Sequence, residues 1–222
     1  MDDIAAAFGE QAALAGHLLA ALGSVEDDGS HDLSHLLRVW RNATAIAERE
    51  TGCDRTVLTA AVVLHDCVAV EKNSPLRAQA SRLASARARD ILGAMGWDTA
   101  RIDAAAHAIE AHSFSAGIAP ETLEARVLQD ADRLDAIGAI GVARCFYVAG
   151  RLGSRLYEPS DPEAVYRELD DRTFALDHFA VKLFKVAAKF QTEAGQALAD
   201  ARCRTMHDFV RTLLAEVGGS NG

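Results

Sequence analysis

The sequence contains little proline, and it lacks both long apolar runs and alternating polar and apolar residues. Only four prolines occur in 222 residues, and no alternating stretch is long enough to predict a β-strand. No uninterrupted apolar segment reaches the roughly 18 residues that a transmembrane helix requires. These absences argue against a β-rich fold and against a protein that spans a membrane.

Cysteine is scarce, and positive charge does not predominate. The four cysteines lie far apart without a Cys-x-x-Cys pair, which is typical of reduced thiols and not of a disulfide framework or a structural zinc site. The net charge of −9 argues against a protein that binds the phosphates of a nucleic acid polymer. The N-terminal `MDDIAAAFGEQ` carries acidic residues where a secretory signal would be basic. We therefore expect a cytoplasmic protein that binds neither a nucleic acid polymer nor a membrane, of unknown oligomeric state.

What the sequence does contain is the pattern of a helical protein. Half of its residues are hydrophobic, and a chain of this length buries roughly 70% of its unfolded surface. Alanine is abundant, and apolar residues recur at helical spacing. The sequence predicts one all-α domain, residues 1–222, of about nine helices. The predicted helices include residues 3–22, 33–50, 55 to about 65, about 78–94, 99 to about 112, 121–149, 173–194 and 196–216. Ser30 or Asp32 is expected to cap the helix over 33–50, and Asp54 the helix that starts at residue 55.

The apolar stretch `LTAAVVLHDCVAV` carries a histidine and an aspartate side by side. His65 lies seven residues after Leu58 and three after Val62, a spacing that places all three on the buried face of a helix. Burying an isolated carboxylate is costly enough that such groups are paired, bind a metal or become neutral. Asp66, which follows His65, therefore needs a partner.

Further polar residues lie on or beside predicted apolar helix faces. His35 lies at the edge of one such face, and His112 shares a face with Ile109. In `QDADRLDAIGAIG`, Asp130 and Asp132 are two positions apart, so a regular helix does not direct both toward one site. Periodicity leaves open which of the two aspartates faces inward.

Two imidazoles and two carboxylates on three helices form a plausible set of metal ligands. A single histidine on an apolar face is more often a hydrogen-bonded core residue, so the prediction depends on the combination. This set suits Mn²⁺, Fe²⁺, Co²⁺, Zn²⁺ or Mg²⁺, with positions left for water and substrate. A divalent cation would neutralise Asp66 and give His65 a partner.

The order His35, His65–Asp66 and Asp132 resembles the H…HD…D signature of the HD-domain metal-dependent phosphohydrolases. The stretches `HDLSHLLRVWRNA`, `HDCVAVEKNSPLRAQAS`, `HAIEAHSFSAGIAPETLEARVLQDADRLDAIGAIGVAR` and `LDHFAVKL` resemble the YedJ-like branch of bacterial HD hydrolases over residues 30–215. The resemblance implies an all-α fold around one divalent metal ion, and it selects Asp132 rather than Asp130 as a ligand. We favour Mn²⁺, with Mg²⁺, Co²⁺, Fe²⁺, Ni²⁺ or Zn²⁺ as alternatives.

The implied activity is hydrolysis of phosphate esters or anhydrides, with a nucleotide as the expected small phosphorylated substrate. In the nucleotidase branch of the superfamily an acidic residue stands three positions after the aspartate of the doublet, where this chain has Ala69. The catalytic assignment of that branch is therefore not transferred. The predicted catalytic residues are Lys72 and His112, and the predicted substrate-binding residues are Arg38, Lys72, His112 and Lys182.

Three other functions fit the same pattern less well. An HD-fold phosphodiesterase would use the same ligands. A di-iron oxygenase would need a second metal held by His112 and His107, whose directions differ by about 140° on a helix. A non-catalytic nucleotide-binding module would not require the complete ligand set. The sequence does not specify the base, the sugar, the number of phosphates or whether phosphate or pyrophosphate is released.

Overall fold

The computed structural model describes residues 2–23, 33–68, 70, 79–113 and 116–218. The chain divides into two compact units, residues 1–132 (unit 1) and residues 133–222 (unit 2). The described residues form helices and no strand, apart from an isolated bridge between Arg155 and Phe174. The predicted all-α class is therefore confirmed. Among the described helices, none is both long and apolar enough to cross a membrane.

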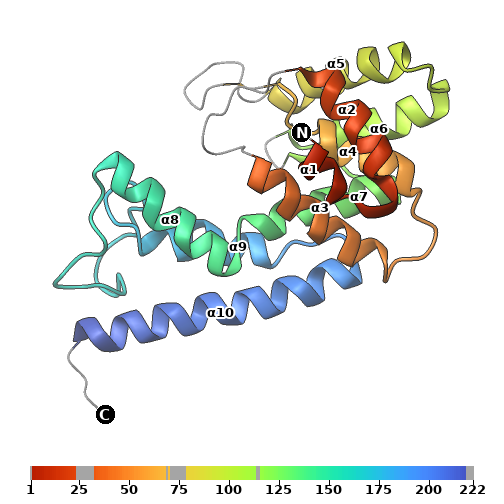
Figure 1. The fold of residues 1–222 in the computed structure, drawn as a ribbon. Coiled ribbons are helices and arrows are strands. Elements are labelled where there is room, and N and C mark those ends of the chain that lie inside the picture. Colours follow the sequence, from red (N-terminus) through yellow and green to blue (C-terminus); the bar gives the residue numbers. More distant parts are fainter. Residues whose placement is uncertain (1, 24–32, 69, 71–78, 114–115, 219–222) are drawn as a thin grey trace. The chain divides into compact units, whose positions relative to one another are not determined.

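Unit 1 contains a set of packed helices around a central one, α4 (Figure 1). Helices α2, α3, α5 and α6 each contact α4. The elements are α1 (Asp2–Ala6), a 3₁₀ turn (Gly9–Gln11), α2 (Ala12–Leu22), α3 (Leu33–Ala47), α4 (Arg55–Leu64), α5 (Ala80–Ala94), α6 (Thr99–His112) and the start of α7 (Leu123–Asp135).

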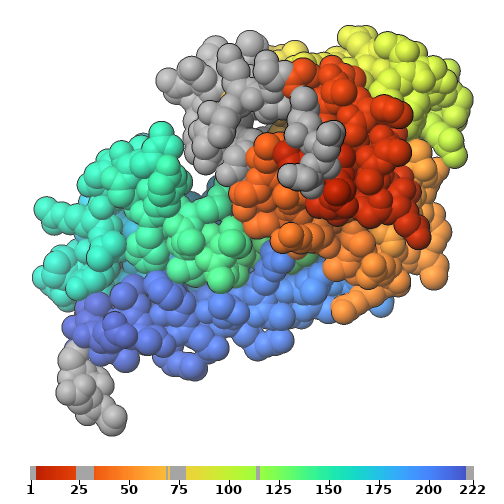
Figure 2. All heavy atoms as spheres, viewed as in Figure 1, coloured from red at the N-terminus to blue at the C-terminus, as the bar shows by residue number. Residues whose placement is uncertain are grey.

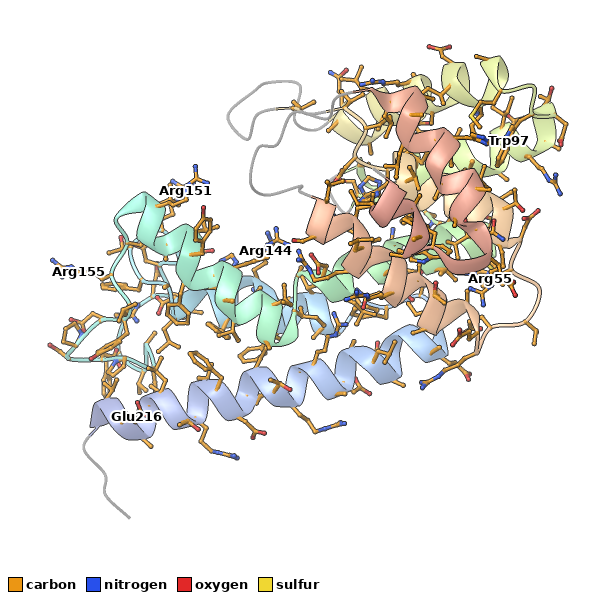
Figure 3. All side chains as sticks on the ribbon, viewed as in Figure 1. Arg55, Trp97, Arg144, Arg151, Arg155 and Glu216 are labelled. Carbon is orange, nitrogen blue, oxygen red and sulfur yellow. The ribbon has the colours of Figure 1, made fainter. Side chains whose placement is uncertain are left out.

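Helix α4 is buried over most of its length, and it ends at the histidine–aspartate doublet. Every residue from Val57 to Leu64 is buried. The helix begins where the Asp54 side chain accepts hydrogen bonds from the backbone N–H groups of Thr56 and Val57, as the sequence predicted. Arg55, labelled in Figure 3, is the first residue of α4 and so lies at the opposite end from the doublet. The core helix thus carries the doublet at its C-terminal end.

Unit 2 is built from α8 (Gly138–Leu152), a π-helical turn (Phe179–Leu183), α9 (Phe184–Ala187) and α10 (Glu193–Gly218). Helix α10 packs against both α8 and α9. Phe146, Phe179 and Phe209 form an aromatic cluster with ring centroids 5.6–6.2 Å apart. Figure 2 shows the side chains of α10 at the surface along the length of the helix. Phe209 of α10 thus packs against the rings of Phe146 on α8 and Phe179 on the π-helical turn.

Several helices are shorter than predicted. The segment 121–149 is two helices, α7 and α8, because the backbone at Gly138 takes a positive φ of 73°. A Cβ at this position would lie 3.0 Å from side-chain carbons of Arg202, so both the backbone and the packing favour glycine. Within the predicted helix over 173–194, only residues 177–187 and the last two residues, where α10 begins, are helical, and the predicted helix over 3–22 is interrupted around Gly9. The expected caps Ser30 and Asp32 lie outside the described residues.

All four cysteines are free thiols, in agreement with their spacing in the sequence. Burial is the main cause that raises the pKa of Cys53 to about 12 and the pKa of Cys67 to about 11. Thiols with such pKa values are almost fully protonated at neutral pH, and the protonated form is a poor nucleophile and a poor metal ligand. Burial thus makes the Cys53 and Cys67 thiols weak nucleophiles and weak metal ligands at neutral pH.

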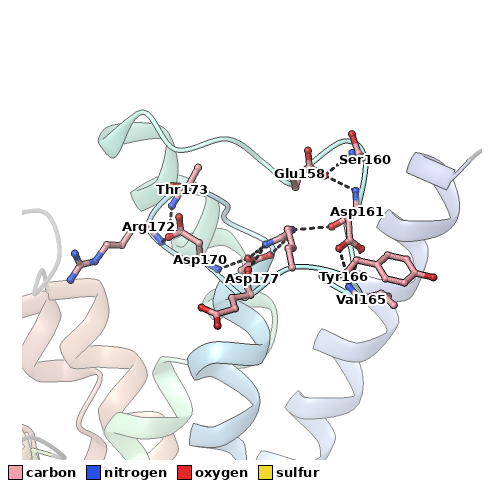
Figure 4. A network of polar contacts seen from close by, with 11 residues as sticks. Glu158, Ser160, Asp161, Val165, Tyr166, Asp170, Arg172, Thr173 and Asp177 are labelled. Carbon is pink, nitrogen blue, oxygen red and sulfur yellow. Dashed lines mark hydrogen bonds and ion pairs between the residues drawn. The ribbon is translucent and has the colours of Figure 1, made fainter.

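The long loop between α8 and the π-helical turn is organised by a buried carboxylate (Figure 4). The two side-chain oxygens of Asp177 accept hydrogen bonds from the Arg167 guanidinium at 2.6 and 2.8 Å, and one also accepts from the Asp170 N–H at 2.7 Å. The Asp177 side chain is only 1% exposed, and the same guanidinium lies 4.8 Å from the Phe174 ring centroid. These contacts give this irregular segment one fixed conformation.

We expect Asp177→Ala to lower the midpoint of thermal unfolding by about 5 °C or more, because it leaves a guanidinium and a backbone N–H without their partner. The matched control is Asp208→Ala, which removes an ion pair with Arg211 whose aspartate side chain is 63% exposed. Such exposed pairs contribute little to stability. Equal midpoints for the two variants, measured by circular dichroism, would contradict the structural role of Asp177.

Candidate metal centre

His65 is fixed with one ring nitrogen directed into the centre. It follows α4 and is 2% exposed, and its Nδ1 lies 2.8 Å from the Val62 carbonyl oxygen. Because a carbonyl only accepts, Nδ1 donates this hydrogen bond, and in the neutral ring Nε2 keeps its lone pair. Burial lowers the pKa of His65, although the nearby Asp66 carboxylate opposes that effect. The imidazole is therefore neutral at pH 7, the form that binds a metal.

His112 is oriented in the same way at the end of α6. Its Nδ1 donates to the Ile109 carbonyl oxygen at 2.6 Å, so Nε2 is the nitrogen available to a ligand or substrate. The Nε2 atom lies 3.7 Å from Oδ1 of Asp66. The ring stands edge-on to the His65 ring, with centroids 5.0 Å apart. The structure thus brings His112 next to the doublet, and its role in substrate binding stays a prediction.

Helices α3 and α7 add the remaining members of the centre. His35, which is 4% exposed on α3, places its Nε2 3.3 Å from Nε2 of His65. The same His35 atom lies 3.7 Å from Oδ2 of Asp66 and 3.6 Å from Oδ1 of Asp132 on α7. His65 Nε2 lies 3.4 Å from Oδ2 of Asp66. Residues that are almost 100 positions apart in the sequence therefore present nitrogen and oxygen atoms to one small volume.

The spacing of these atoms fits a bound divalent cation. Ligands about 2.1 Å from a tetrahedral or octahedral metal lie about 3.0–3.5 Å from one another, close to the observed distances of 3.3–3.7 Å. The imidazoles are buried, whereas the side chains of Asp66 and Asp132 are each 31% exposed, which leaves a side open to water. Among the described residues, two groups have ligand atoms within 4.8 Å of one another: His35, His65 and Asp132, and His65, Asp66 and His112.

The two neighbouring aspartates of α7 occupy different environments. Asp132 approaches His35, whereas Asp130 is completely buried. Residues two positions apart on a helix differ by about 200° in direction, so this separation follows from helical geometry. The structure places Asp132 beside His35, and its role as a metal ligand stays the prediction that the family resemblance implied.

The other predicted residues have varied positions. Arg38 donates to the Ser34 hydroxyl on its own helix at 2.7 Å. Lys182 is exposed on the π-helical turn of unit 2, and Lys72 lies outside the described residues. His107, considered for a second metal, accepts a hydrogen bond at Nε2 from the Glu121 backbone N–H at 3.0 Å. That nitrogen is therefore engaged with backbone, which disfavours a role as a ligand.

Two amide side chains near the centre were not singled out from the sequence. Asn42 donates to the Ala131 carbonyl at 3.0 Å, and Gln129 donates to the Ala111 carbonyl at 2.6 Å. Both residues are buried. A sequence signal existed, because Asn42 follows His35 by seven residues and so lies on the same helix face.

The chain is similar to known proteins in both sequence and structure. Residues 32–137 match the HD domain family. The chain is 31% identical over 198 residues to the YpgQ protein of Bacillus subtilis, covering 87% of this chain and 88% of that one. The structure is similar to that of an HD-superfamily hydrolase from Bacillus thuringiensis, with a TM-score of 0.72 and 28% identity over 93% of this chain and 97% of that one. It is also similar to the structure of Bacillus subtilis YpgQ in complex with ADP, with a TM-score of 0.71 and 30% identity over 94% and 97% of the two chains.

The chain therefore belongs to the HD-domain family. The family and the ligand set together define its general class, a metal-dependent hydrolase.

We expect Asp132→Asn to lose most metal affinity and nearly all activity, because a carboxylate oxygen at the centre is replaced by a neutral amide. Asp130→Asn should keep a full complement of metal and lose at most roughly 10–100-fold in affinity or activity, as is typical for a group that supports a ligand without binding the metal. Both variants are titrated with Mn²⁺ by calorimetry. If Asp130→Asn empties the site while Asp132→Asn stays loaded, the assignment on α7 must be exchanged.

Proposed function

We propose that this protein is a nucleotide (pyro)phosphohydrolase of the YedJ-like branch that uses one divalent cation, with Mn²⁺ favoured. The proposed ligands are His35, His65, Asp66 and Asp132. The observation that supports this assignment is that Nε2 of His35 lies 3.3–3.7 Å from atoms of the other three residues, and Nε2 of His65 lies 3.4 Å from Asp66. A bound cation in such a site supplies an activated water molecule and neutralises charge on phosphoryl oxygens.

His112 is proposed to handle the proton of the reaction. Its Nδ1 proton is committed to the Ile109 carbonyl, so Nε2 is the ring atom that exchanges a proton with the substrate. In the protonated ring, Nε2–H can donate to a phosphoryl oxygen or to the leaving oxygen. Oδ1 of Asp66 lies 3.7 Å from this nitrogen, so the atom that exchanges the proton adjoins a proposed metal ligand.

Cationic side chains are proposed to bind the phosphates. Negative charge spreads over the phosphoryl oxygens in the transition state, so nearby cations contribute strongly. Because the chain as a whole has a net charge of −9, the positive charge that binds the phosphates must come from individual Lys and Arg side chains near the site. Arg38, one turn after His35, is suited to bidentate contact with a phosphate, and Lys72 and Lys182 are the further candidates. The complex of YpgQ with ADP supports a nucleotide as the ligand class.

The test is a screen of nucleoside mono-, di- and triphosphates and phosphodiesters with Mn²⁺, Mg²⁺ and Co²⁺, with phosphate and pyrophosphate measured separately. We expect metal-dependent release from nucleotides and none from Asp66→Ala, which removes both carboxylate oxygens from the centre. Metal content is measured on the same samples, and one ion per chain is expected. Stoichiometric binding without turnover of any substrate would favour a binding module, and two irons per chain would favour an oxygenase.

We expect His112→Gln to lower kcat by roughly 10²–10⁴-fold, the usual contribution of a positioned acid or base. Glutamine keeps a polar side chain but does not exchange a proton near neutral pH, so substrate binding should change less than kcat. The control is His107→Gln on the same helix, which loses a contact to backbone outside the centre. Equal activity of the two variants in steady-state kinetics would remove His112 from the mechanism.

A further inference from the structure

Two buried amides hold backbone carbonyls that directly precede residues of the metal centre. Gln129 Nε2 donates to the carbonyl of Ala111, the residue before His112. Asn42 Nδ2 donates to the carbonyl of Ala131, the residue before Asp132. Each hydrogen bond therefore fixes the main chain one residue away from a functional side chain.

The two hydrogen bonds connect three helices that carry the centre. Asn42 lies two helical turns after His35 on α3, so its bond to α7 fixes His35 relative to Asp132. Gln129 lies three residues before Asp132 on α7, so its bond to the end of α6 fixes Asp132 relative to His112. Together they connect α3 to α7, across 89 residues of sequence, and α7 to α6, the helix that precedes it.

The location of the Gln129 bond favours a role in geometry over a role in stability. Ala111 lies in the last turn of α6, where carbonyls have no partner within the helix. Gln129 satisfies one such carbonyl, but its own Oε1 is buried without a hydrogen-bond partner among the described residues. A buried acceptor without a partner opposes folding and offsets what the hydrogen bond contributes. The amide therefore adds little net stability, yet it orients the last turn of α6.

We propose that Asn42 and Gln129 are positioning residues that set the distances within the metal centre. This proposal rests on the proposed function, because it takes His35 and Asp132 as ligands and His112 as the residue that handles the proton. Asn42 acts on two ligands and so controls metal affinity. Gln129 acts on one ligand and on His112, and so controls turnover more strongly than metal affinity.

The experiment compares Asn42→Leu and Gln129→Met, which keep approximate side-chain size and remove the donor, with Ser85→Ala as the matched control. The Ser85 hydroxyl is also buried and also donates across two helices, to the Ala106 carbonyl at 2.9 Å, but Ala106 does not adjoin a residue of the centre. Three quantities are measured on each full-length protein: the Kd of Mn²⁺ by calorimetry on metal-free protein, the unfolding midpoint of the metal-free protein, and kcat at saturating Mn²⁺.

We expect Asn42→Leu to raise the Kd of Mn²⁺ about tenfold, at the lower end of the effect of residues that orient ligands. Gln129→Met should lower kcat about tenfold with a smaller change in Kd, and its metal-free midpoint should stay close to that of the wild type. Ser85→Ala should keep the wild-type Kd and kcat and lose only stability. If one variant does not fold, the other still tests its own half of the proposal.

Two outcomes overturn the proposal, and they are distinguishable. If the wild type binds Mn²⁺ but both amide variants match Ser85→Ala in Kd and kcat, the amides do not position the centre, while the proposed function stands. If the wild type binds no divalent cation, the proposed function fails, and the positioning role fails with it.

Discussion

The structure of unit 1 depends on placing hydrogen-bonding and charged groups where a helical core would otherwise be apolar. His35, His65 and His112 are almost completely buried, and the carboxylates of Asp66 and Asp132 approach them within 3.7 Å. Burial lowers the pKa of His65 and so disfavours its charged form, yet the carboxylates of Asp66 and Asp132 call for positive charge nearby. A divalent cation bound at this centre would supply that charge without requiring a charged His65.

The helices around this centre fix the positions and the ring orientations of its residues. The doublet follows α4, whose residues from Val57 onward are buried, so its position is set by the packing of the core. The ring orientations are set locally, since His65 and His112 each bind the carbonyl three residues earlier. Orientation thus comes from the helix that carries each histidine, whereas the distances between the histidines come from packing and from the contacts of Asn42 and Gln129.

Features of the fold that depend on neighbouring residues were predicted from the sequence, whereas features that depend on distant contacts were not. The start of α4 at Asp54 and the buried position of His65 were predictable, because capping and helical periodicity depend on neighbouring residues. The long helix predicted over 121–149 was wrong, because its break at Gly138 coincides with close packing of Arg202, which is far away in the sequence. The helix over 173–194 was also overpredicted, since the bonds that Asp177 makes with Arg167 and Asp170 stabilise an irregular backbone there.

The sequence by itself determined the all-α class and the kinds of residue at the candidate site, because helical periodicity and the cost of burying charge are properties of short segments. It could not choose between Asp130 and Asp132 without a family resemblance, since both lie beside apolar residues on the same helix. Only the tertiary structure placed Asp132 next to His35, showed that both His112 and His65 lie close to Asp66, and revealed the contacts of Asn42 and Gln129. These relations join residues from different helices, and their distances depend on how the helices pack, which no local pattern specifies.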